Sequence, residues 1–121
     1  MTALEGFSDK GVEPFDTIRG QAHYKVCFYT MADGTTQSSG TETFTGTIDR
    51  CGTGSVMWRS EGSFTAPDPA TGIAQAKGTW SVVPGTGTGG FSKMRNGGGR
   101  WALESTPQLE ANGVQLGAAT C

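Results

Sequence analysis

Residues 35–49 read TTQSSGTETFTGTID, and the alternation within this stretch decides the fold class. Successive side chains of a β-strand point to opposite faces of the sheet, so the odd and even positions can be read separately. The even positions include Glu42, Phe44 and Ile48. The odd positions are all polar, namely Thr35, Gln37, Ser39, Thr41, Thr43, Thr45, Thr47 and Asp49. The stretch therefore predicts a long strand with one solvated face and one face toward a core.

The preceding segment, 21–31, reads QAHYKVCFYTM and alternates in the same way. Its more apolar face consists of Ala22, Tyr24, Val26 and Phe28. Between the two segments, Asp33-Gly34 is a turn signal typical of a β-hairpin. The two segments are therefore predicted to form an antiparallel pair.

Segments farther along the chain repeat this alternation. Residues 52–66 place one set of side chains on a shared face: Val56, Trp58, Ser60 and Phe64. Residues 73–83 do so with Ala74, Ala76, Trp80 and Val82. The segment 100–105, RWALES, does so with Trp101, Leu103 and Ser105. Three further strands are therefore predicted.

Glycine and proline mark the predicted interruptions. Gly62, inside a strand, predicts a bulge or a tight bend, and the PDP run at 67–69 predicts a loop. Residues 109–118 predict a weak strand, which could fold as a hairpin around the Asn-Gly pair at 112–113.

We expect one domain over residues 1–121, an all-β fold shaped as a small antiparallel β-barrel of about eight strands, similar in shape to a lipocalin. Closure of a barrel removes the exposed edges of long strands, and the 20 glycines suit the sharp bends of a small barrel. Residues 1–20 are expected to form one irregular strand and residues 106–121 a weakly defined tail. Such a barrel is either filled by side chains or holds one small ligand.

Charge and hydropathy exclude several classes of protein. Nine basic and eleven acidic residues give a net charge of -2, which leaves no basic surface for nucleic acid or an anionic membrane. No stretch approaches the ~20 apolar residues of a membrane helix, and the first ten residues, MTALEGFSDK, do not read as a secretory signal. We therefore expect a cytoplasmic protein with neither nucleic acid nor membrane as a partner. A secreted chain without its leader is the alternative.

The cysteines give little support to a disulfide framework or a zinc site. Cys27, Cys51 and Cys121 are odd in number and have no C-x-x-C spacing. We expect reduced thiols, as in cytosolic proteins, and an exposed free thiol at the terminal Cys121. No metal or other cofactor is expected.

One stretch resembles a known family. Residues 78–91 read GTWSVVPGTGTGGF and are followed by three glycines at 97–99. This run resembles the GTW-x-V-x-PG-x-GTG-x-(F/L) signature of a bacterial family of small proteins grouped with the allene oxide cyclase-like barrels, whose plant relatives include allene oxide cyclases and dirigent proteins. The resemblance covers roughly residues 35–105 and departs from the family pattern at residues 50–52, Arg-Cys-Gly. The glycines are no phosphate-binding loop, because no Lys-Ser/Thr pair and no predicted helix follow them.

The resemblance implies a barrel whose apolar pocket steers ring closure or coupling of a reactive small molecule. It thereby suggests a cofactor-independent cyclase or isomerase that acts on a hydrophobic intermediate in bacterial secondary metabolism, with no catalytic triad to carry over. One alternative is a non-catalytic protein that binds a small apolar ligand or confers resistance to it. A filled barrel with only a structural role is the other.

The predicted inner face supplies the candidate site residues. Glu42 is a candidate catalytic group, because a carboxyl among apolar side chains has a raised pKa and can act as an acid or a base. Tyr24 is the second, through a hydroxyl that could polarise a carbonyl or bond to Glu42. A solvated position for Glu42 and core packing for Tyr24 are the alternatives. The predicted substrate-binding residues, which could equally form the core, are Phe28, Phe44, Trp58, Trp80 and Ser60.

The predicted outer face carries two further features. His23, the single histidine, has no nearby Ser or Cys partner for a triad and is expected at the surface or at an interface. Tyr29, Met31 and Met57 are apolar on this otherwise polar face, which predicts a subunit interface and hence a homo-oligomer.

Overall fold

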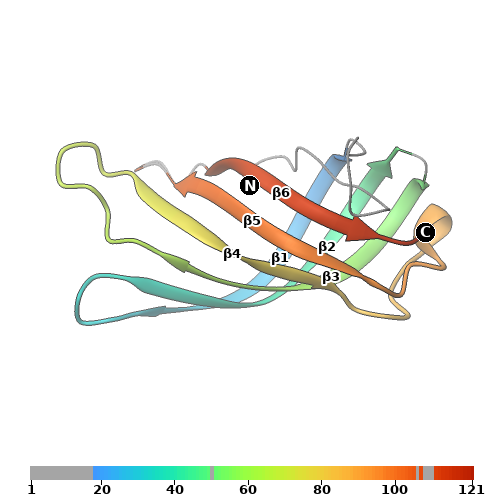
Figure 1. The fold of residues 1–121 in the computed structure, drawn as a ribbon, viewed down its shortest axis with the longest axis horizontal. Helices are drawn as coiled ribbons and strands as arrows, with labels where there is room; N and C mark the ends of the chain where they lie inside the picture. Colours follow the sequence, from blue (N-terminus) through green and yellow to red (C-terminus); the bar gives the residue numbers. More distant parts are fainter. Residues whose placement is uncertain (1–17, 50, 106, 108–110) are drawn as a thin grey trace.

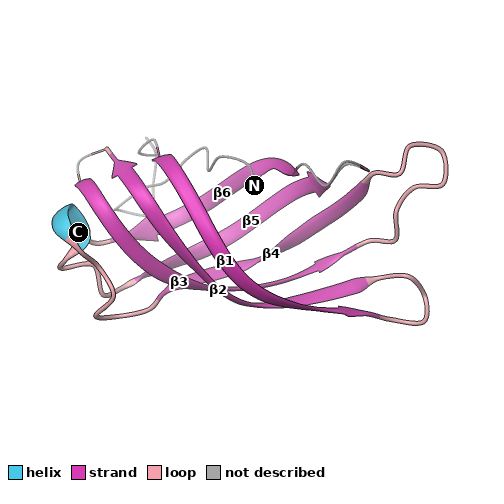
Figure 2. Cartoon of the chain, turned by 180° about the vertical axis from the view of Figure 1, so that it is seen from behind, coloured by secondary structure: helices cyan, strands magenta, loops and turns pink. Residues whose placement is uncertain are grey.

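Six strands, each antiparallel to the next, make up the part of the chain that the computed structural model describes, residues 18–49, 51–105, 107 and 111–121 (Figure 1). The strands are β1 (Ile18–Thr30), β2 (Thr36–Ile48), β3 (Gly52–Phe64), β4 (Ala74–Val82), β5 (Gly97–Ser105) and β6 (Ala111–Ala119). One turn of 3-10 helix, η1 (Gly89–Phe91), lies between β4 and β5 (Figure 2). The all-β, antiparallel prediction is confirmed.

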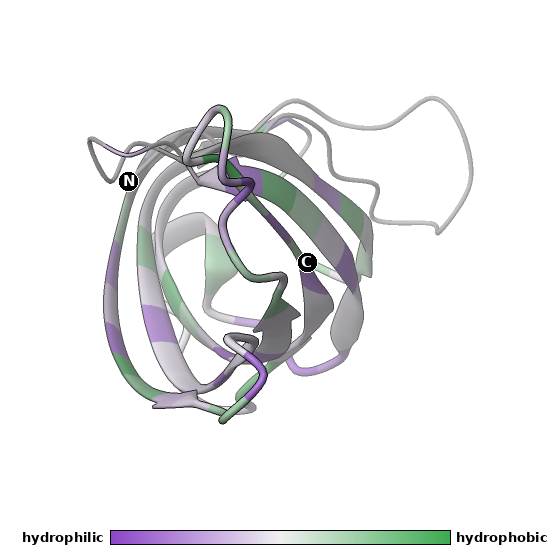
Figure 3. Ribbon diagram, turned by 90° about the vertical axis from the view of Figure 1, so that its left-hand side faces the viewer, coloured by the Kyte–Doolittle hydropathy of each residue, from purple (hydrophilic) through white to green (hydrophobic). Residues whose placement is uncertain are grey.

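The sheet follows the order of the sequence, β1-β2-β3-β4-β5-β6, so β1 and β6 form its two edges. Viewed from one end, it curls strongly around a central axis (Figure 3). Because β1 and β6 are not paired with each other in the described residues, a closed barrel of about eight strands stays a prediction. Most of the irregular strand predicted for residues 1–20 falls on 1–17, outside the described residues.

The two ends of the curled sheet differ. At one end lie η1 and the C-terminus; we call this the covered end (Figures 1 and 2). At the other lie the turn 31–35 and the loop 65–73, which we call the open end (Figure 1). The turn confirms the Asp33-Gly34 prediction: Gly34 has a positive φ of 90°, and Asp33 Oδ1 accepts hydrogen bonds from Thr35 N (3.0 Å) and Thr35 Oγ1 (2.7 Å). These bonds hold the pKa of the Asp33 carboxyl below its usual value.

The pairing register defines which side chains share the inner face of the curl. These are the even positions of β1 to β4 and the odd positions of β5 and β6, since Gly78 pairs with Trp101 and Trp101 with Gln115. Burial alternates accordingly along β4 and along residues 100–105. The predicted faces of these two segments are therefore confirmed.

The bulge alternative at Gly62 and the hairpin at 112–113 are wrong. Gly62 forms no bulge, because it pairs in regular register with both Ser38 and Gly78. Glycine is needed there for close approach: the ring of Trp101 occupies the space that a Cβ would take at Gly62 and at Gly78. No hairpin forms at 112–113 either, because residues 111–119 pair continuously with β5 and this ladder prevails over the local turn preference.

The core lies on the inner face and includes side chains from outside the strands. Phe44 and Trp58 stack with ring centroids 5.4 Å apart, and Trp58 lies 5.3 Å from Trp80. Phe91 and Met94, from the connection between β4 and β5, complete this cluster and are fully buried. The other buried members are Ile48, Val56, Val82 and Ala119. The interior is thus packed with side chains around this cluster.

The segment 83–88, which contains the first five residues of the PGTGTG run, pairs with the part of β3 that β4 does not reach. β4 pairs with residues 58–64 of β3 only. In the part of β3 that precedes Trp58, Met57 N donates a hydrogen bond to Thr86 Oγ1 and Ser55 N donates one to Thr88 Oγ1, each at 3.0 Å. Backbone bonds from Val83 N to Met57 O (2.9 Å) and from Thr88 N to Ser55 O (2.8 Å) accompany them. We call this segment the 83–88 strap.

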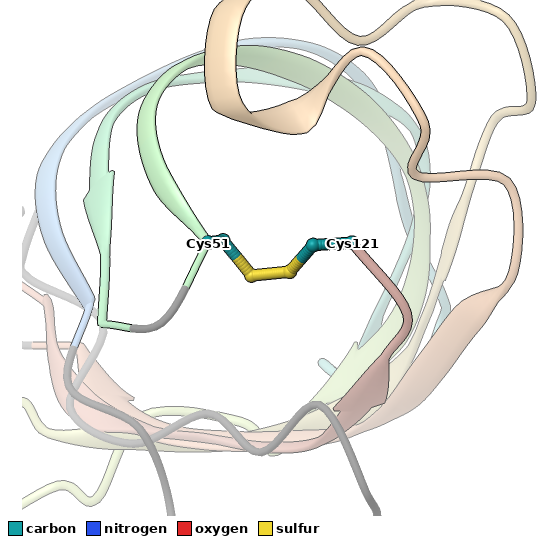
Figure 4. Close-up of a disulfide and its surroundings, with 2 residues drawn as sticks. All are labelled: Cys51 and Cys121. Atoms are coloured by element: carbon teal, nitrogen blue, oxygen red, sulfur yellow. A yellow bond between two sulfur atoms is a disulfide. The ribbon is translucent and has the colours of Figure 1, made fainter.

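A disulfide joins Cys51 and Cys121 at the covered end, with the two Cα atoms 5.6 Å apart (Figure 4). The expected free thiol at Cys121 and the expected reduced thiol at Cys51 are therefore both wrong. The curl of the sheet brings the end of β6 beside the β2–β3 turn, a proximity that residues 70 apart in sequence do not reveal. Cys27 is a free, exposed cysteine. No helix among the described residues is long and apolar enough to cross a membrane.

Candidate functional site

Glu42 lies on the inner face of β2, between Tyr24 of β1 and Trp58 of β3 in the pairing register. Trp58 Nε1 donates a hydrogen bond of 2.9 Å to Glu42 Oε2. Burial raises the pKa of the Glu42 carboxyl, while the hydrogen bond from Trp58 opposes this by favouring the charged form. The result is an ionisable group held in place beside the aromatic core.

This arrangement leaves part of the carboxyl available. Trp58 is the hydrogen-bond partner of Glu42 among the described residues, and it engages one of the two oxygens. Because its pKa is raised, the carboxyl keeps its proton to a higher pH than an exposed glutamate does. It can therefore give a proton to a bound molecule or, once ionised, accept one.

The other residues predicted for the site fall into two groups. Phe44, Trp58, Trp80 and Ser60 are buried, the three aromatic ones within the core cluster. Tyr24 and Phe28 point to the inner face from the edge strand β1 and stay open to solvent, with 50% and 56% of their surfaces exposed. Although Tyr24 lies directly across from Glu42, no hydrogen bond between the two is seen in the described residues.

A second aromatic group lies toward the open end. Phe28 meets Phe64 edge to face with ring centroids 6.0 Å apart, and Phe64 lies 6.3 Å from Trp101. Trp101 Nε1 donates to Thr79 O at 3.2 Å. None of the three rings is fully buried. We call Phe28, Phe64 and Trp101 the open aromatic row.

Sequence reasoning placed Phe64 and Trp101 on strands but not in the site. The alternation of polar and apolar residues shows on which face of the sheet a ring lies. It does not show which of these rings Phe91 and Met94 cover. The glycines at 62 and 78 were the available signal, because two glycines paired across neighbouring strands leave room for a large ring above them.

Residues 16–112 match the model of a family described as a protein of unknown function, DUF3224. The chain belongs to the DUF3224 family. The match to DUF3224 includes Glu42, the open aromatic row and the 83–88 strap. No curated protein and no solved structure shows significant similarity to the chain.

An open groove of about 940 Å³, which we call the outer groove, is lined in part by Ser38 and Trp101 but not by Glu42. Most of its lining side chains belong to the outer face, among them Gln37, Glu61, Lys77, Thr79 and Arg100. These side chains are exposed and polar. We place the candidate site on the inner face, because an ionisable group is partly buried beside aromatic rings there.

The described residues contain no group of three or more His, Cys, Asp or Glu side chains that could hold a metal ion.

The stability of this DUF3224 protein is expected to carry a pH dependence that Glu42→Gln removes. Since the folded pKa is raised, the unfolded chain loses its proton first as the pH rises above the ordinary value of 4.5. The folded state then binds more protons than the unfolded state, so the contribution of Glu42 to stability falls with pH until the raised pKa is passed. Urea unfolding between pH 4 and 8 should show the wild type losing stability relative to Glu42→Gln over this window. Glu61→Gln, at an exposed outer-face position of β3, is the matched control, and an identical profile for both variants would contradict the assignment.

Proposed function

We propose that this DUF3224 protein binds a small, largely apolar molecule on the inner face of its curled sheet, and that Glu42 exchanges a proton with the bound molecule. A cofactor-independent cyclase or isomerase works in this way. The observation that supports this proposal is the partly buried carboxyl of Glu42 beside the aromatic core. One of its oxygens accepts a hydrogen bond from Trp58 Nε1. Binding and orientation of the molecule would supply the rest of the rate enhancement.

The exposed part of the inner face supports the binding step. Tyr24 and the open aromatic row present apolar surface, and the rings are spaced for contact with one another. Ligand sites are typically lined by apolar and aromatic side chains with few polar groups. The resemblance to allene oxide cyclase-like barrels adds the expectation of a hydrophobic intermediate from bacterial natural-product biosynthesis. A closed barrel is part of this proposal, because closure would shield the inner face from water.

A neutral apolar probe, N-phenyl-1-naphthylamine, is expected to bind the inner face and to lose at least about tenfold in affinity in Phe28→Asp. A charge at Phe28 would have to be desolvated beneath the probe, which is unfavourable. Energy transfer from tryptophan to the probe measures the binding. Because Phe28 is 56% exposed, the substitution should leave the fold intact, as circular dichroism can verify.

Tyr29→Asp is the matched control, since Tyr29 follows Phe28 on the same strand, points to the outer face and is 72% exposed. Equal losses in the two variants would place the probe outside the inner face. Absence of binding to the wild type, together with absence of any copurifying small molecule in native mass spectra, would contradict the proposed function.

Non-catalytic binding is the second candidate, and the high exposure of Tyr24 and Phe28 favours it, because catalytic sites usually exclude water. A molecule that copurifies with the protein separates the two. Mass spectrometry after incubation with fresh protein shows either a rearranged product, as expected for a cyclase or isomerase, or the unchanged molecule, as expected for a carrier.

Two further expectations stay proposals. Tyr29 and Met31 are exposed apolar side chains, which supports a homo-oligomer interface near the open end, whereas Met57 is only partly exposed beside the 83–88 strap. A cytoplasmic location is the other. The Cys51–Cys121 disulfide is the observation that speaks against it, since such bonds persist mainly in oxidising compartments.

A further inference from the structure

Gln115 is a buried polar residue whose side-chain donor is not satisfied. It lies on β6 with 3% of its surface exposed, and its Nε2 has no hydrogen-bond partner among the described residues. Most buried polar side-chain atoms in proteins are hydrogen-bonded, because leaving a donor unpaired destabilises the fold. An amide in this position points to an acceptor that the described residues do not supply.

The register places this amide beside the open aromatic row. Gln115 pairs directly with Trp101 and shares its inner face. The ring of Trp101 in turn lies over the glycines at 62 and 78. The same transverse row continues through Gly62 to Ser38, a second buried polar residue, and ends at Phe28 on β1. Along this row the Gln115 amide therefore lies beside Trp101 at the β6 end, and the Ser38 hydroxyl lies between Trp101 and Phe28.

We propose that Gln115 Nε2 donates a hydrogen bond to a carbonyl oxygen of the molecule that binds on the open aromatic row. This inference rests on the proposed function and deepens it, because it names the ligand class: a planar, conjugated ketone, aldehyde or ester. A planar body contacts the exposed rings, and the oxygen in its plane reaches the amide at their margin. A site built to hydrogen-bond such an oxygen discriminates strongly against analogues without it.

The offset between Gln115 and Glu42 along the strand direction sets a lower limit on the length of the ligand, because β2 and β6 are also four strands apart in the sheet. Ser38, in the row of Gln115, precedes Glu42 by four residues on β2, which corresponds to about 13 Å along the strand. A single molecule that contacts both polar groups is therefore elongated, with its carbonyl at one end and its proton-exchanging atom at the other. Extended conjugated ketones have these dimensions.

The experiment compares two fluorescent probes of similar aromatic size. Prodan carries a ketone, and N-phenyl-1-naphthylamine carries no oxygen. We expect Gln115→Met to weaken Prodan binding about tenfold, as loss of a hydrogen bond in a desolvated site does, and to leave the affinity for N-phenyl-1-naphthylamine within about twofold. The emission of bound Prodan should also move to shorter wavelength, because its carbonyl loses a hydrogen-bond donor.

The stability of the ligand-free protein gives a second measurement. Methionine fills a volume similar to that of glutamine without an unpaired donor, so Gln115→Met should raise the melting temperature by roughly 4 °C. Gln37→Met, at an exposed outer-face position of β2 that lines the outer groove, is the matched control. It should change neither the melting temperature nor the ratio of the two probe affinities.

The outcomes separate this inference from the proposed function. If neither probe binds the wild type, the proposed function fails and this inference fails with it. If both bind and Gln115→Met leaves their affinity ratio unchanged, only the role of Gln115 is overturned. A lower melting temperature with an unchanged ratio would likewise assign Gln115 to the core, and a changed ratio in Gln37→Met alone would move the probe to the outer groove.

Discussion

Replacing Cys121 by serine is expected to lower the free energy of unfolding by about 4 kcal/mol. The disulfide closes a loop between residues that are 70 apart in the sequence. Such a link restricts the unfolded chain, and the loss of this restriction accounts for the size of the effect. The bond also fastens the end of β6 to the β2–β3 turn, where both cysteines pack against the core cluster. Urea unfolding without reductant measures the difference.

The third cysteine provides the control. Cys27 is free and exposed on β1, so Cys27→Ser should change the stability by no more than about 0.5 kcal/mol. Wild-type protein unfolded in the presence of dithiothreitol should resemble Cys121→Ser. If Cys121→Ser were as stable as the oxidised wild type, the disulfide would contribute nothing to the fold.

Phe91→Ala is expected to destabilise the protein by about 3–5 kcal/mol. Phe91 is 0% exposed, although it lies in the connection between β4 and β5 and not on a strand. Its ring lies 6.1 Å from that of Phe44 and packs in the same cluster as Met94. Truncation would leave a cavity that the paired strands cannot readily close. Thermal and urea unfolding should both show the loss.

Phe28→Ala removes the same atoms from a half-exposed position on β1 and should cost less than about 1.5 kcal/mol. The contrast between these two phenylalanines tests whether the covered end holds the core. A loss at position 91 no larger than that at position 28 would show that the connection between β4 and β5 does not pack into the interior.

Local alternation was sufficient to predict most of the strands and their faces. The alternation of polar and apolar side chains is a property of residues adjacent in the sequence. It can therefore be recognised in β2, β4 and β5 without knowing which strands pair with them. It also placed Glu42 and Trp58 on inner faces. Their direct pairing depends on the register between β2 and β3, which the alternation alone does not determine.

The features that the sequence could not predict depend on the curl of the sheet. The proximity of Cys51 and Cys121, the insertion of Phe91 into the interior and the burial of Gln115 each join segments that are distant in the chain. Sequence patterns also gave the wrong result where a non-local contact replaced a local preference. Gly62 is the example, since it accommodates the Trp101 ring and not a bulge.

The 83–88 strap has a consequence for how the protein behaves at high concentration. Residues 53–57 of β3 extend beyond β4, and an uncovered strand edge is a template on which another chain can pair and begin to aggregate. The hydroxyl groups of Thr86 and Thr88 accept the backbone N–H groups of this edge. Because side-chain hydroxyl groups occupy these donors, the series of strand-to-strand hydrogen bonds ends there. An additional strand would instead expose a new edge. The two threonines therefore protect this part of the β3 edge against pairing with another chain.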